Sequence, residues 1–260
     1  MLVCTLGDLL LDVIVRLETP LASGDDSVAM TTLAPGGQAA NVAAWAAALG
    51  AQAHVVAVQA GDDAGVILRR ELEARGVEMC GPRGERTGVV VSLVGPDGER
   101  TMASDRGSAG ELRAETLDPS WLECDALHVS GYALLGNAAP RAVELARERG
   151  ARVSVDLSAW THVERNRDAL RETLAQVQPD VVFGNEREWD ALGDVNAVVR
   201  VVKRGARGIR VDGDEHDAVP VDAVDSTGAG DALAAGFIVG GAQLALETAA
   251  RCVAQVGAMP

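Results

Sequence analysis

The sequence predicts an α/β fold with a mostly parallel central sheet that helices cover on both faces. Short apolar runs alternate with helical patterns along most of the chain, which is typical of βαβ units. The chain has 260 residues with 48% hydrophobic but only 3% aromatic content, so Ala, Val and Leu must build most of its core. This length favours one domain that spans residues 1–260.

The expected strands are short apolar runs bounded by turn residues. They cover Leu2 to Leu6, His54 to Val58, Ala126 to Val129, Arg152 to Asp156 and Val181 to Phe183. The expected helices between them cover Ala39 to Leu49, Ala64 to Arg75, Pro140 to Arg149 and Arg167 to Val177. Strands that alternate with helices in this way pair in parallel and are buried on both faces.

Two regions interrupt the alternation and predict a small separate β-sheet. Leu11 to Leu17 and Val28 to Leu33 mix apolar and polar residues. Gly88 to Val94 and Glu99 to Ala103 flank the sequence Gly-Pro-Asp-Gly at Gly95 to Gly98, which indicates a hairpin. No helical pattern follows these strands. We therefore expect a β-sheet lid, formed by about residues 11–35 and 86–107, across one end of the main sheet.

A lid without covering helices is also a candidate interface between two copies of the chain. Val89, Val91, Leu93 and Met102 would leave apolar side chains on an open sheet face. We therefore expect a homodimer that forms through the lid. The alternative is a monomer whose lid folds against its own domain.

Composition and charge exclude several classes of function. The net charge of −15 and the pI near 4.6 disfavour nucleic acid and anionic membrane surfaces as partners. The four cysteines lack C-x-x-C spacing, which argues against a zinc site or a disulfide framework. The start of the chain has no signal-peptide pattern, and no uninterrupted apolar run reaches membrane-spanning length. A soluble, cytoplasmic protein is expected.

The segment Asp225 to Asp231 combines a glycine-rich turn with the start of a helix. Its sequence, Asp-Ser-Thr-Gly-Ala-Gly-Asp, runs into the apolar stretch Ala232 to Val239. N–H groups at a helix start lack intrahelical acceptors and lie at the positive end of the helix dipole, so such a turn suits phosphate oxygens. Asp231 beside this site could accept a proton from a hydroxyl group that attacks the phosphate. The alternative is an ordinary helix N-terminus with an acidic first turn.

Two further motifs precede this segment. Gly36 to Asn41 reads GGQAAN and is followed by GDDAG at Gly61 to Gly65, and Asn185 and Glu188 form N-x-x-E after an expected strand. In this order the three motifs resemble those of the ribokinase (PfkB) family of carbohydrate and nucleoside kinases, over essentially the whole chain. The resemblance implies a ribokinase-like three-layer α/β/α sandwich with a small β-sheet lid, and ATP as the phosphate donor.

The resemblance also implies roles for the residues of the C-terminal motif. Asp231 matches the family's catalytic base. The N–H groups of Gly228, Ala229 and Gly230 match its anion hole, which stabilises the transferred phosphoryl group.

Asn185 and Glu188 match family residues that hold Mg²⁺ and its waters near the triphosphate, so that Glu188 is an indirect metal ligand. The alternative is purely structural. In that case Asn185 caps a helix and Glu188 is its partner in a capping box.

The acceptor site is expected near the N-terminal motif and the lid. Gly36 and Gly37 would let the backbone approach a small polar ligand, and Asn41 offers a donor and an acceptor to hydroxyl groups. Asp12 suits a pair of sugar hydroxyls and is favoured over Asp8, which precedes it. Arg106 at the end of the second lid hairpin is a further candidate substrate contact, although a surface arginine is the ordinary interpretation.

Lys203, Gly205 and Gly208 resemble the family's T-x-G-x-x-G segment beside the nucleotide, with Lys where Thr is often found. The alternative is a basic surface turn.

Asp225 and Thr227 match positions that help to bind a monovalent cation such as K⁺ in many relatives, together with backbone groups around Gly257. Asp225 could instead cap its own turn.

One departure bears on the substrate, because Gln38 stands where relatives with the motif G-G-K-G-A-N have Lys. Ribose specificity is therefore not supported.

The sequence predicts ATP-dependent phosphorylation of a hydroxyl group, expected to be a primary one, of a small sugar or sugar derivative. A nucleoside kinase is the alternative, and it would need Trp45 or Tyr132 to form an aromatic pocket for the base of the nucleoside. A non-catalytic binding protein on the same fold is a third possibility, and a Rossmann oxidoreductase is disfavoured because Gly7 to Leu10 lacks G-x-G-x-x-G.

Overall fold

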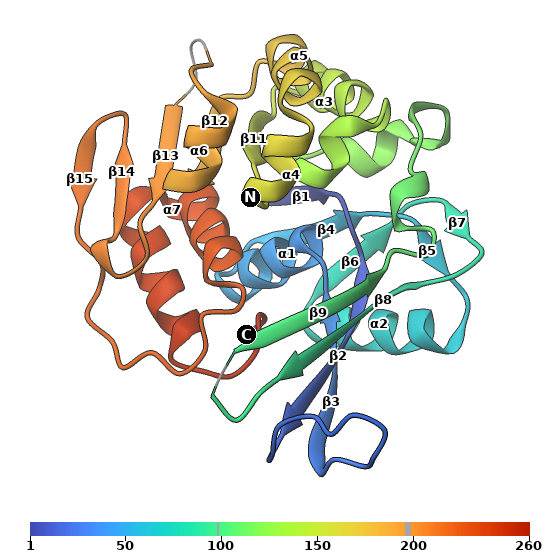
Figure 1. Cartoon of the computed structure of the whole chain (residues 1–260). Coiled ribbons are helices and arrows are strands. Elements are labelled where there is room, and N and C mark those ends of the chain that lie inside the picture. The colour runs from blue at the N-terminus through green and yellow to red at the C-terminus, as the bar shows by residue number, and fades with distance from the viewer. Residues whose placement is uncertain (98, 196–198) are drawn as a thin grey trace.

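The central sheet of the computed structural model is mostly parallel, and residues 1–97, 99–195 and 199–260 are described (Figure 1). Strands β13 to β6 in the sheet order are mutually parallel, and β14 and β15 extend one edge in antiparallel fashion. The strand order is β15 (Asp214–His216), β14 (Ile209–Val211), β13 (Val199–Lys203), β12 (Val181–Asn185), β11 (Arg152–Asp156), β10 (Ala126–Ser130), β1 (Leu2–Leu6), β4 (Gln52–Val56) and β6 (Val77–Cys80).

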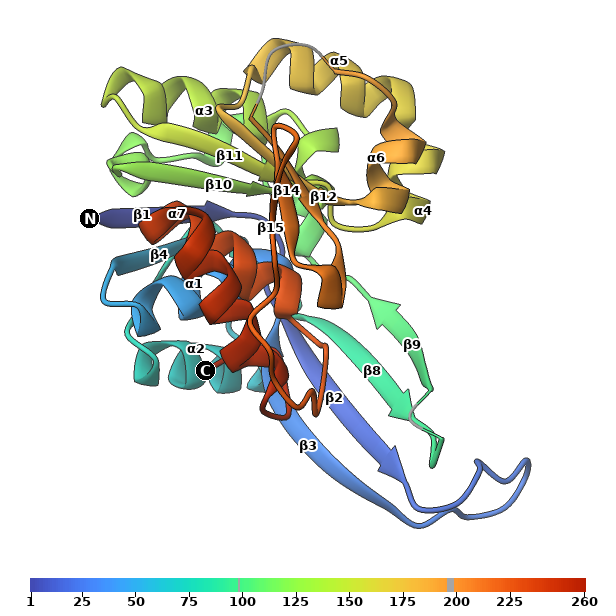
Figure 2. The same ribbon diagram turned by 90° about the vertical axis from the view of Figure 1, so that its left-hand side faces the viewer.

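Helices cover both faces of this sheet (Figure 2). One face carries α1 (Gln38–Ala48), α2 (Asp63–Ala74) and α7 (Ala229–Val253). The other carries α3 (Ala138–Glu148), α4 (Trp160–Arg165), α5 (Arg167–Val177) and α6 (Glu186–Leu192). The three-layer α/β/α prediction is therefore confirmed, and the expected strands and helices match to within a few residues at each end.

The core is divided between the two helical layers. Ala side chains from α1 and α7 allow these helices to approach each other and the sheet closely, and Trp45 and Phe183 are among the largest side chains buried there. The core on the other face is rich in Leu and Val from α3, α5 and the strands. Short 3₁₀ turns connect the elements at Ala109–Glu111, Ala114–Thr116, Pro119–Leu122, Gly131–Leu135 and Gly205–Arg207.

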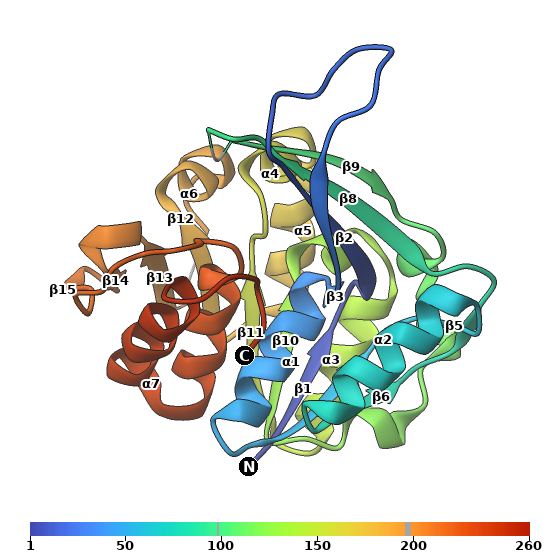
Figure 3. The same cartoon turned by 90° about the horizontal axis from the view of Figure 1, so that it is seen from below.

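The segments expected to form a lid pair into a separate sheet that projects from one end of the main sheet (Figure 3). Its order is β3 (Ala29–Gly36), β2 (Leu10–Leu17), β8 (Gly88–Val94) and β9 (Arg100–Asp105). The hairpin between β8 and β9 is confirmed as antiparallel. Gly98, at the expected turn of this hairpin, lies outside the described residues. A short pair, β5 (Gln59–Ala60) with β7 (Arg83–Gly84), lies between the lid and β6.

The two faces of the lid differ from the expectation drawn from its sequence. Val91 and Leu93 share a face with their cross-strand neighbours Val13 and Val15, and that face is partly exposed. Met102 pairs with Ser92 and therefore belongs to the opposite face. The period of two along a strand sends successive side chains to opposite faces, so Met102 was wrongly grouped with Val91 and Leu93.

The long helix α7 also departs from the sequence analysis, because it is long and apolar enough to cross a membrane by length and composition. Gly240 and Gly241 interrupt its helical geometry with φ values of −150° and 80°. Its residues Ala232 to Ala235 are buried against α1 and the sheet. This packing is that of the core helix of a globular protein.

The second glycine motif is explained by local packing. Asp62 caps α2 by accepting a hydrogen bond from the Gly65 N–H, and it also accepts from the Thr87 N–H next to β8. A Cβ atom on Gly65 would overlap the carbonyl oxygen of Ala60. This motif therefore anchors the base of the lid to the main domain.

We predict that Gly65→Ala destabilises the protein, although alanine is the better helix former by about 1 kcal/mol. The overlap with the Ala60 carbonyl must be relieved by backbone movement, which typically costs about 1–3 kcal/mol. Gly110→Ala is the matched control because its Cβ would enter open space. Urea unfolding of both variants measures the effect, and equal midpoints would contradict the assignment.

Candidate active site

The predicted functional residues gather at the carboxyl ends of the parallel strands. Strand β1 lies between β10 and β4. After β1 the chain adds β4 and β6 on one side of it, and β10 and the later strands are added on the other side. Such a switch in strand order leaves a crevice at the carboxyl ends, where ligands bind in open α/β sheets. The ends of β11, β12 and β13 carry Asp156, Asn185 and Lys203.

The glycine-rich turn lies at the N-terminus of α7, as expected. Gly228 is the N-cap residue and has a left-handed φ of 76°, which glycine adopts without strain. The Ala229 N–H donates weakly to the Ser226 carbonyl at 3.3 Å. Among the described residues, the N–H groups of Gly228 and Gly230 have no acceptor. Two of the three predicted anion-binding donors thus remain available.

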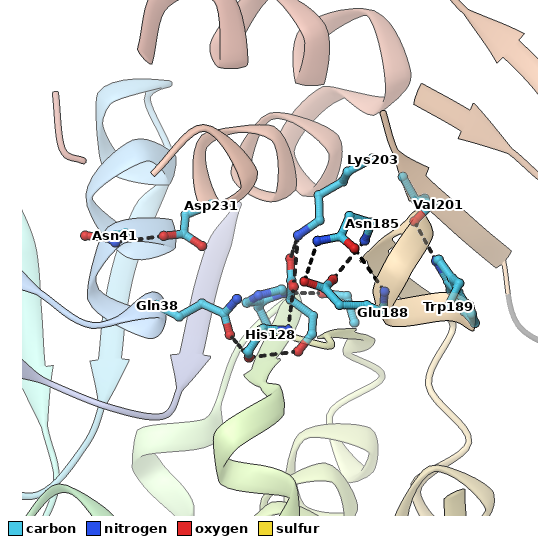
Figure 4. Close-up of polar contacts among 12 residues, drawn as sticks. Gln38, Asn41, His128, Asn185, Glu188, Trp189, Val201, Lys203 and Asp231 are labelled. Atoms are coloured by element: carbon cyan, nitrogen blue, oxygen red, sulfur yellow. Dashed lines mark hydrogen bonds and ion pairs between the residues drawn. The ribbon is translucent and has the colours of Figure 1, made fainter. Parts of the chain in front are cut away.

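Asp231 follows this turn in the first turn of α7 and contacts α1. The Asn41 side-chain amide donates a hydrogen bond of 2.7 Å from Nδ2 to Oδ2 of Asp231 (Figure 4). The other end of the same amide, Oδ1, is buried and has no partner among the described residues. Asn41 therefore orients the carboxylate, and its unsatisfied oxygen points away from Asp231 (Figure 4). Asn41 does not cap its helix, because the N-cap residue of α1 is Gly37.

The environment of Asp231 makes it a stronger base than an ordinary carboxylate. Burial raises the pKa of Asp231 from 3.8 to about 7, and the charge of Asp156 adds to this effect. The hydrogen bond from Asn41, the nearby Gln38 side chain and the charge of Lys203 oppose the increase. A group with a pKa near the working pH is well matched to general base catalysis.

Lys203 and Asp156 form a buried ion pair behind the glycine turn. The Lys203 ammonium lies 2.7 and 3.0 Å from the two carboxylate oxygens of Asp156. Asp156 is fully buried and 15% of the Lys203 side chain is exposed. Burial alone would lower the pKa of Lys203, but the carboxylates of Asp156 and Glu188 raise it. Lysine therefore remains charged within the site, so a basic surface turn does not describe it.

Asn185 and Glu188 form the capping box that was the structural alternative. The Asn185 side chain accepts from the Glu188 N–H at 2.9 Å, and Glu188 accepts from the Asn185 N–H at 2.8 Å. Glu188 is only 3% exposed, and burial raises its pKa. Its carboxylate nevertheless lies near Lys203 (Figure 4), and the charges of Lys203 and Asp156 both act on it. The structural role is real, and it places Glu188 beside the site at the same time.

The lid contributes Asp12 to the opposite wall of the site. A cavity of about 460 Å³ separates the lid from the glycine turn and is lined by Asp12, Ser92 and Arg100 on one side and by Asp225 to Gly228 on the other. Burial raises the pKa of Asp12 to about 6. The volume lies in the range of small-molecule sites.

Gly36 and Gly37 are required by the packing of the chain itself. A Cβ atom on Gly36 would overlap the Asp12 carboxylate, and one on Gly37 would overlap the Asp8 carbonyl oxygen. The close approach that the sequence predicted for a ligand is thus made by neighbouring protein groups. The glycines act by placing Asp12 and Asp8 against the start of α1.

Arg106 pairs with Asp8, which the sequence analysis had ranked below Asp12. The guanidinium contacts the Asp8 carboxylate at 2.5 Å and lies over the ring of Tyr132, at 4.5 Å from its centroid. His162 packs against the same ring at a centroid distance of 4.8 Å. Asp8 is buried, whereas nearly half of the Arg106 side chain is exposed. Arg106 is therefore held in place beside Asp8 and Tyr132.

The cation site expected at Asp225 contains hydrogen-bond donors. The Asp225 carboxylate accepts from the Thr227 N–H at 2.9 Å and from the Gly257 N–H at 3.1 Å. Arg16 from the lid lies 3.9 Å away. Asp225 thus braces its turn, as the structural alternative stated, and a K⁺ ion would have to share this carboxylate. The K⁺ site stays a prediction.

Two lid arginines reach the turn from the other side of the cavity. Arg100 donates from Nη1 to the Thr227 hydroxyl at 2.7 Å. Arg16 neighbours Arg100 across the sheet, with one strand between them. These contacts connect the lid to the glycine turn.

The predicted nucleotide segment after β13 forms a tight turn. Gly205 and Gly208 have left-handed φ values of 59° and 78°. A Cβ atom on Gly208 would overlap the carbonyl oxygen of His216, so this glycine serves the antiparallel edge of the sheet.

Sequence reasoning missed Ser158 and underrated Gln38. The Ser158 hydroxyl donates to the Gln38 side chain at 2.6 Å, and the Ser158 N–H donates to Asp156 at 3.0 Å. The Gln38 side chain also acts on Asp231, because it lowers the pKa of that carboxyl group. Ser158 has a left-handed φ of 71°, unusual for a serine, which no sequence pattern signals. Gln38 therefore replaces a charged contact by a polar link between Asp231 and the strand β11.

Comparisons with known proteins show to which family the chain belongs. The model of the pfkB family of carbohydrate kinases matches residues 1–259. An ATP-dependent ribose-1-phosphate kinase of Halopiger xanaduensis is 35% identical, over 93% of this chain and 86% of its own length. A fructokinase of Escherichia coli is 30% identical, over 82% and 79%. The crystal structure of adenosine kinase from Sinorhizobium meliloti superposes with a TM-score of 0.85 at 25% identity, over 99% of this chain and 95% of that one. The chain belongs to the pfkB family of carbohydrate kinases.

Proposed function

We propose that the protein transfers the γ-phosphoryl group of ATP to a primary hydroxyl group of a small sugar or sugar derivative. The Asp231–Asn41 pair at the N-terminus of α7 carries this proposal. It holds a carboxylate whose pKa is about 7 in a fixed orientation. A hydroxyl group bound beside Asp231 would donate a hydrogen bond to this carboxylate and then lose its proton to it as the hydroxyl oxygen attacks the phosphorus.

The glycine turn supports the phosphate side of this reaction. The N–H groups of Gly228 and Gly230 lie at the positive end of the α7 dipole, where charge on the transferred group would be stabilised. Asp12 and Arg106 would hold the acceptor from the lid, and closure of the lid would exclude water that competes for the phosphate.

Mg²⁺ is the metal implied by the family. Among the described residues, no group of three or more His, Cys, Asp or Glu side chains could hold a metal ion directly. Mg²⁺ commonly binds through one carboxylate, water and the phosphates of the substrate, and Glu188 fits this pattern. Bound there, the ion would offset the negative charge of the triphosphate.

The surroundings of the aromatic residues favour a sugar over a nucleoside. Trp45 is 1% exposed and donates its indole N–H to the Ala258 carbonyl, so it offers no face to a base. The ring of Tyr132 is already in contact with Arg106 and His162. Two of the relatives are named for ribose 1-phosphate and fructose, whereas the similar structure from Sinorhizobium meliloti is named for adenosine. The lid arginines Arg16 and Arg100 beside Asp12 make a phosphorylated sugar a reasonable acceptor.

A phosphorylation screen tests the proposal. Purified protein with ATP and Mg²⁺ is offered pentoses, hexoses, keto-deoxy sugar acids, ribose 1-phosphate and nucleosides, and ADP release is measured together with the phosphorylated product. Product from a sugar or sugar phosphate supports the proposal. Product from nucleosides alone would assign the nucleoside kinase alternative, and no product from any acceptor would leave a binding protein.

We predict that Asp231→Asn folds, binds ATP and loses phosphoryl transfer by roughly 10²–10⁴-fold, the usual contribution of a general base.

In the wild type kcat/KM should rise with pH and level off above about pH 7, because the base must be deprotonated.

Thermal unfolding supplies an independent check. The folded-state pKa of Asp231 lies above its ordinary value of 3.8, so its protonated form favours folding and this stabilisation is lost as the pH rises towards 7. The variant should therefore gain Tm relative to the wild type at pH 8 and show little gain at pH 4. Near wild-type kcat in the variant would remove Asp231 from the base role.

We predict that Glu188→Gln raises the Mg²⁺ concentration needed for half-maximal activity and lowers kcat, with little change in the KM of the acceptor. Glutamine also completes a capping box, so helix α6 should stay intact. Asn185→Ser is a comparison that keeps a helix cap. A flat Mg²⁺ dependence with a raised acceptor KM would assign Glu188 to the acceptor instead.

A homodimer through the lid is proposed from the half-exposed apolar face formed by Val13, Val15, Leu33, Val91 and Leu93. We predict that light scattering at micromolar concentration gives a dimer and that Leu33→Glu gives a monomer, since a charge would be buried at the interface. Val66→Glu on the exposed side of α2 is the control and should remain dimeric. A monomeric wild type would contradict the proposal.

Four reduced, buried cysteines support the cytoplasm as the compartment of this protein.

A further inference from the structure

The lid contacts the glycine turn through a hydrogen bond to Thr227. Arg100 on β9 donates from Nη1 to the Thr227 hydroxyl at 2.7 Å. Within residues 1–97, 99–195 and 199–260, the only other polar contact between a lid strand and this turn is the looser approach of Arg16 to Asp225, at 3.9 Å. Both Arg100 and Thr227 line the cavity of about 460 Å³ between the lid and the turn. Their hydrogen bond therefore bridges the cavity and does not lie in a packed interface.

Thr227 is held at each of its polar groups. Its N–H donates to Oδ1 of Asp225 at 2.9 Å, and its carbonyl oxygen accepts from Sγ of Cys252 at 3.3 Å. A thiol is a weak donor, whereas a guanidinium makes charge-assisted hydrogen bonds, which are stronger. Of these contacts, the one from Arg100 is strong and is also the one that the lid supplies.

The peptide group after Thr227 carries one of the available anion-binding donors. The Thr227 carbonyl and the Gly228 N–H belong to one planar trans peptide unit, so they point in opposite directions and rotate together. A Cβ atom on Gly228 would overlap the backbone of Ala258, so the turn is closely packed on that side. A restraint on Thr227 is therefore also a restraint on the direction of the Gly228 N–H.

The charge of Arg100 acts on both sides of the cavity. Burial raises the pKa of Asp12 on the lid, and the charge of Arg100 opposes this increase. Burial would also raise the pKa of Asp225, but contacts with Thr227 and Gly257 together with the charge of Arg100 lower it. Arg100 thus lies between the residue proposed to hold the acceptor and the turn proposed to hold the phosphate.

We propose that Arg100 is a positioning residue, which orients the Gly228 N–H through Thr227 when the lid lies against the glycine turn. The proposal rests on the proposed function, since it takes the glycine turn as the site of the transferred phosphoryl group. The anion-binding turn is then fully ordered only while the lid covers the acceptor. Transfer to the acceptor is thereby favoured over transfer to water, because an open lid leaves the turn less well held.

A double-mutant cycle tests the contact in the phosphorylation assay. Arg100→Met removes the donors of the guanidinium, and Thr227→Val removes the hydroxyl group while it keeps a side chain of the same shape. Each variant, and the two combined, should lower kcat by about tenfold, because all three break the same hydrogen bond. The KM of the acceptor should change less than about threefold, since the lost interaction orders the phosphate side.

Two further variants serve as controls. Thr227→Ser keeps the hydroxyl group and should retain near wild-type kcat. Thr101→Val makes the same chemical change at an exposed position of β9 and should also turn over as the wild type does. Additive losses in the double variant, or a loss in Arg100→Met that appears only in the KM of the acceptor, would overturn the proposal, because Arg100 would then act on the acceptor directly.

Hydrogen exchange tests the same contact without an acceptor and so separates it from the proposed function. The amide of residue 227 is hydrogen-bonded to Asp225, and its protection reports how well the turn is held. Relative to the intrinsic rate of each residue type, this amide should exchange about tenfold faster in Arg100→Met and in Thr227→Val, and at the wild-type rate in Thr227→Ser. Equal protection in the wild type and Arg100→Met would overturn the proposal whatever the acceptor screen yields. A screen without product would contradict the proposed function and leave the exchange result to decide the contact.

Discussion

The hydrogen bond from Asn41 to Asp231 joins α1 to α7 through two residues that are 190 positions apart in the sequence. The geometry of the site depends on this bond. It can form only because α1 and α7 pack closely, which their alanine-rich facing sides permit. Asn41 is buried by the same packing and so cannot satisfy its remaining oxygen with protein groups. The small residues of the core thus fix the distance between Asp231, the proposed base, and Asn41.

A second constraint is the concentration of negative charge at the carboxyl ends of the strands. Asp156, Glu188 and Asp231 are each at least partly buried there, and burial raises the pKa of Glu188 and of Asp231. Lys203 offsets part of this charge, and the positive end of α7 offsets more. In a protein with a net charge of −15 these local groups must supply the attraction for a nucleotide.

Several residues have structural and chemical roles at once, which is why sequence patterns left alternatives open. Asn185 and Glu188 form a complete capping box, yet the box also brings Glu188 close to Lys203 and Asp156. Asp225 braces a turn with both carboxylate oxygens. A helix N-terminus needs carboxylates for the same electrostatic reason that makes it a site for phosphate, so the two functions use the same residue types.

The sequence by itself determined the order of strands and helices, the existence of the lid and the motifs that carry Asp231, Asn41 and Asn185. These features are local, because periodicity and turn chemistry act over a few residues. Only the tertiary structure decided that Gly36 and Gly37 accommodate Asp12 and Asp8, that Met102 lies on the cavity face, and that Lys203 meets Asp156. Such contacts depend on which elements become neighbours and on the register between strands, and no short stretch of sequence records either.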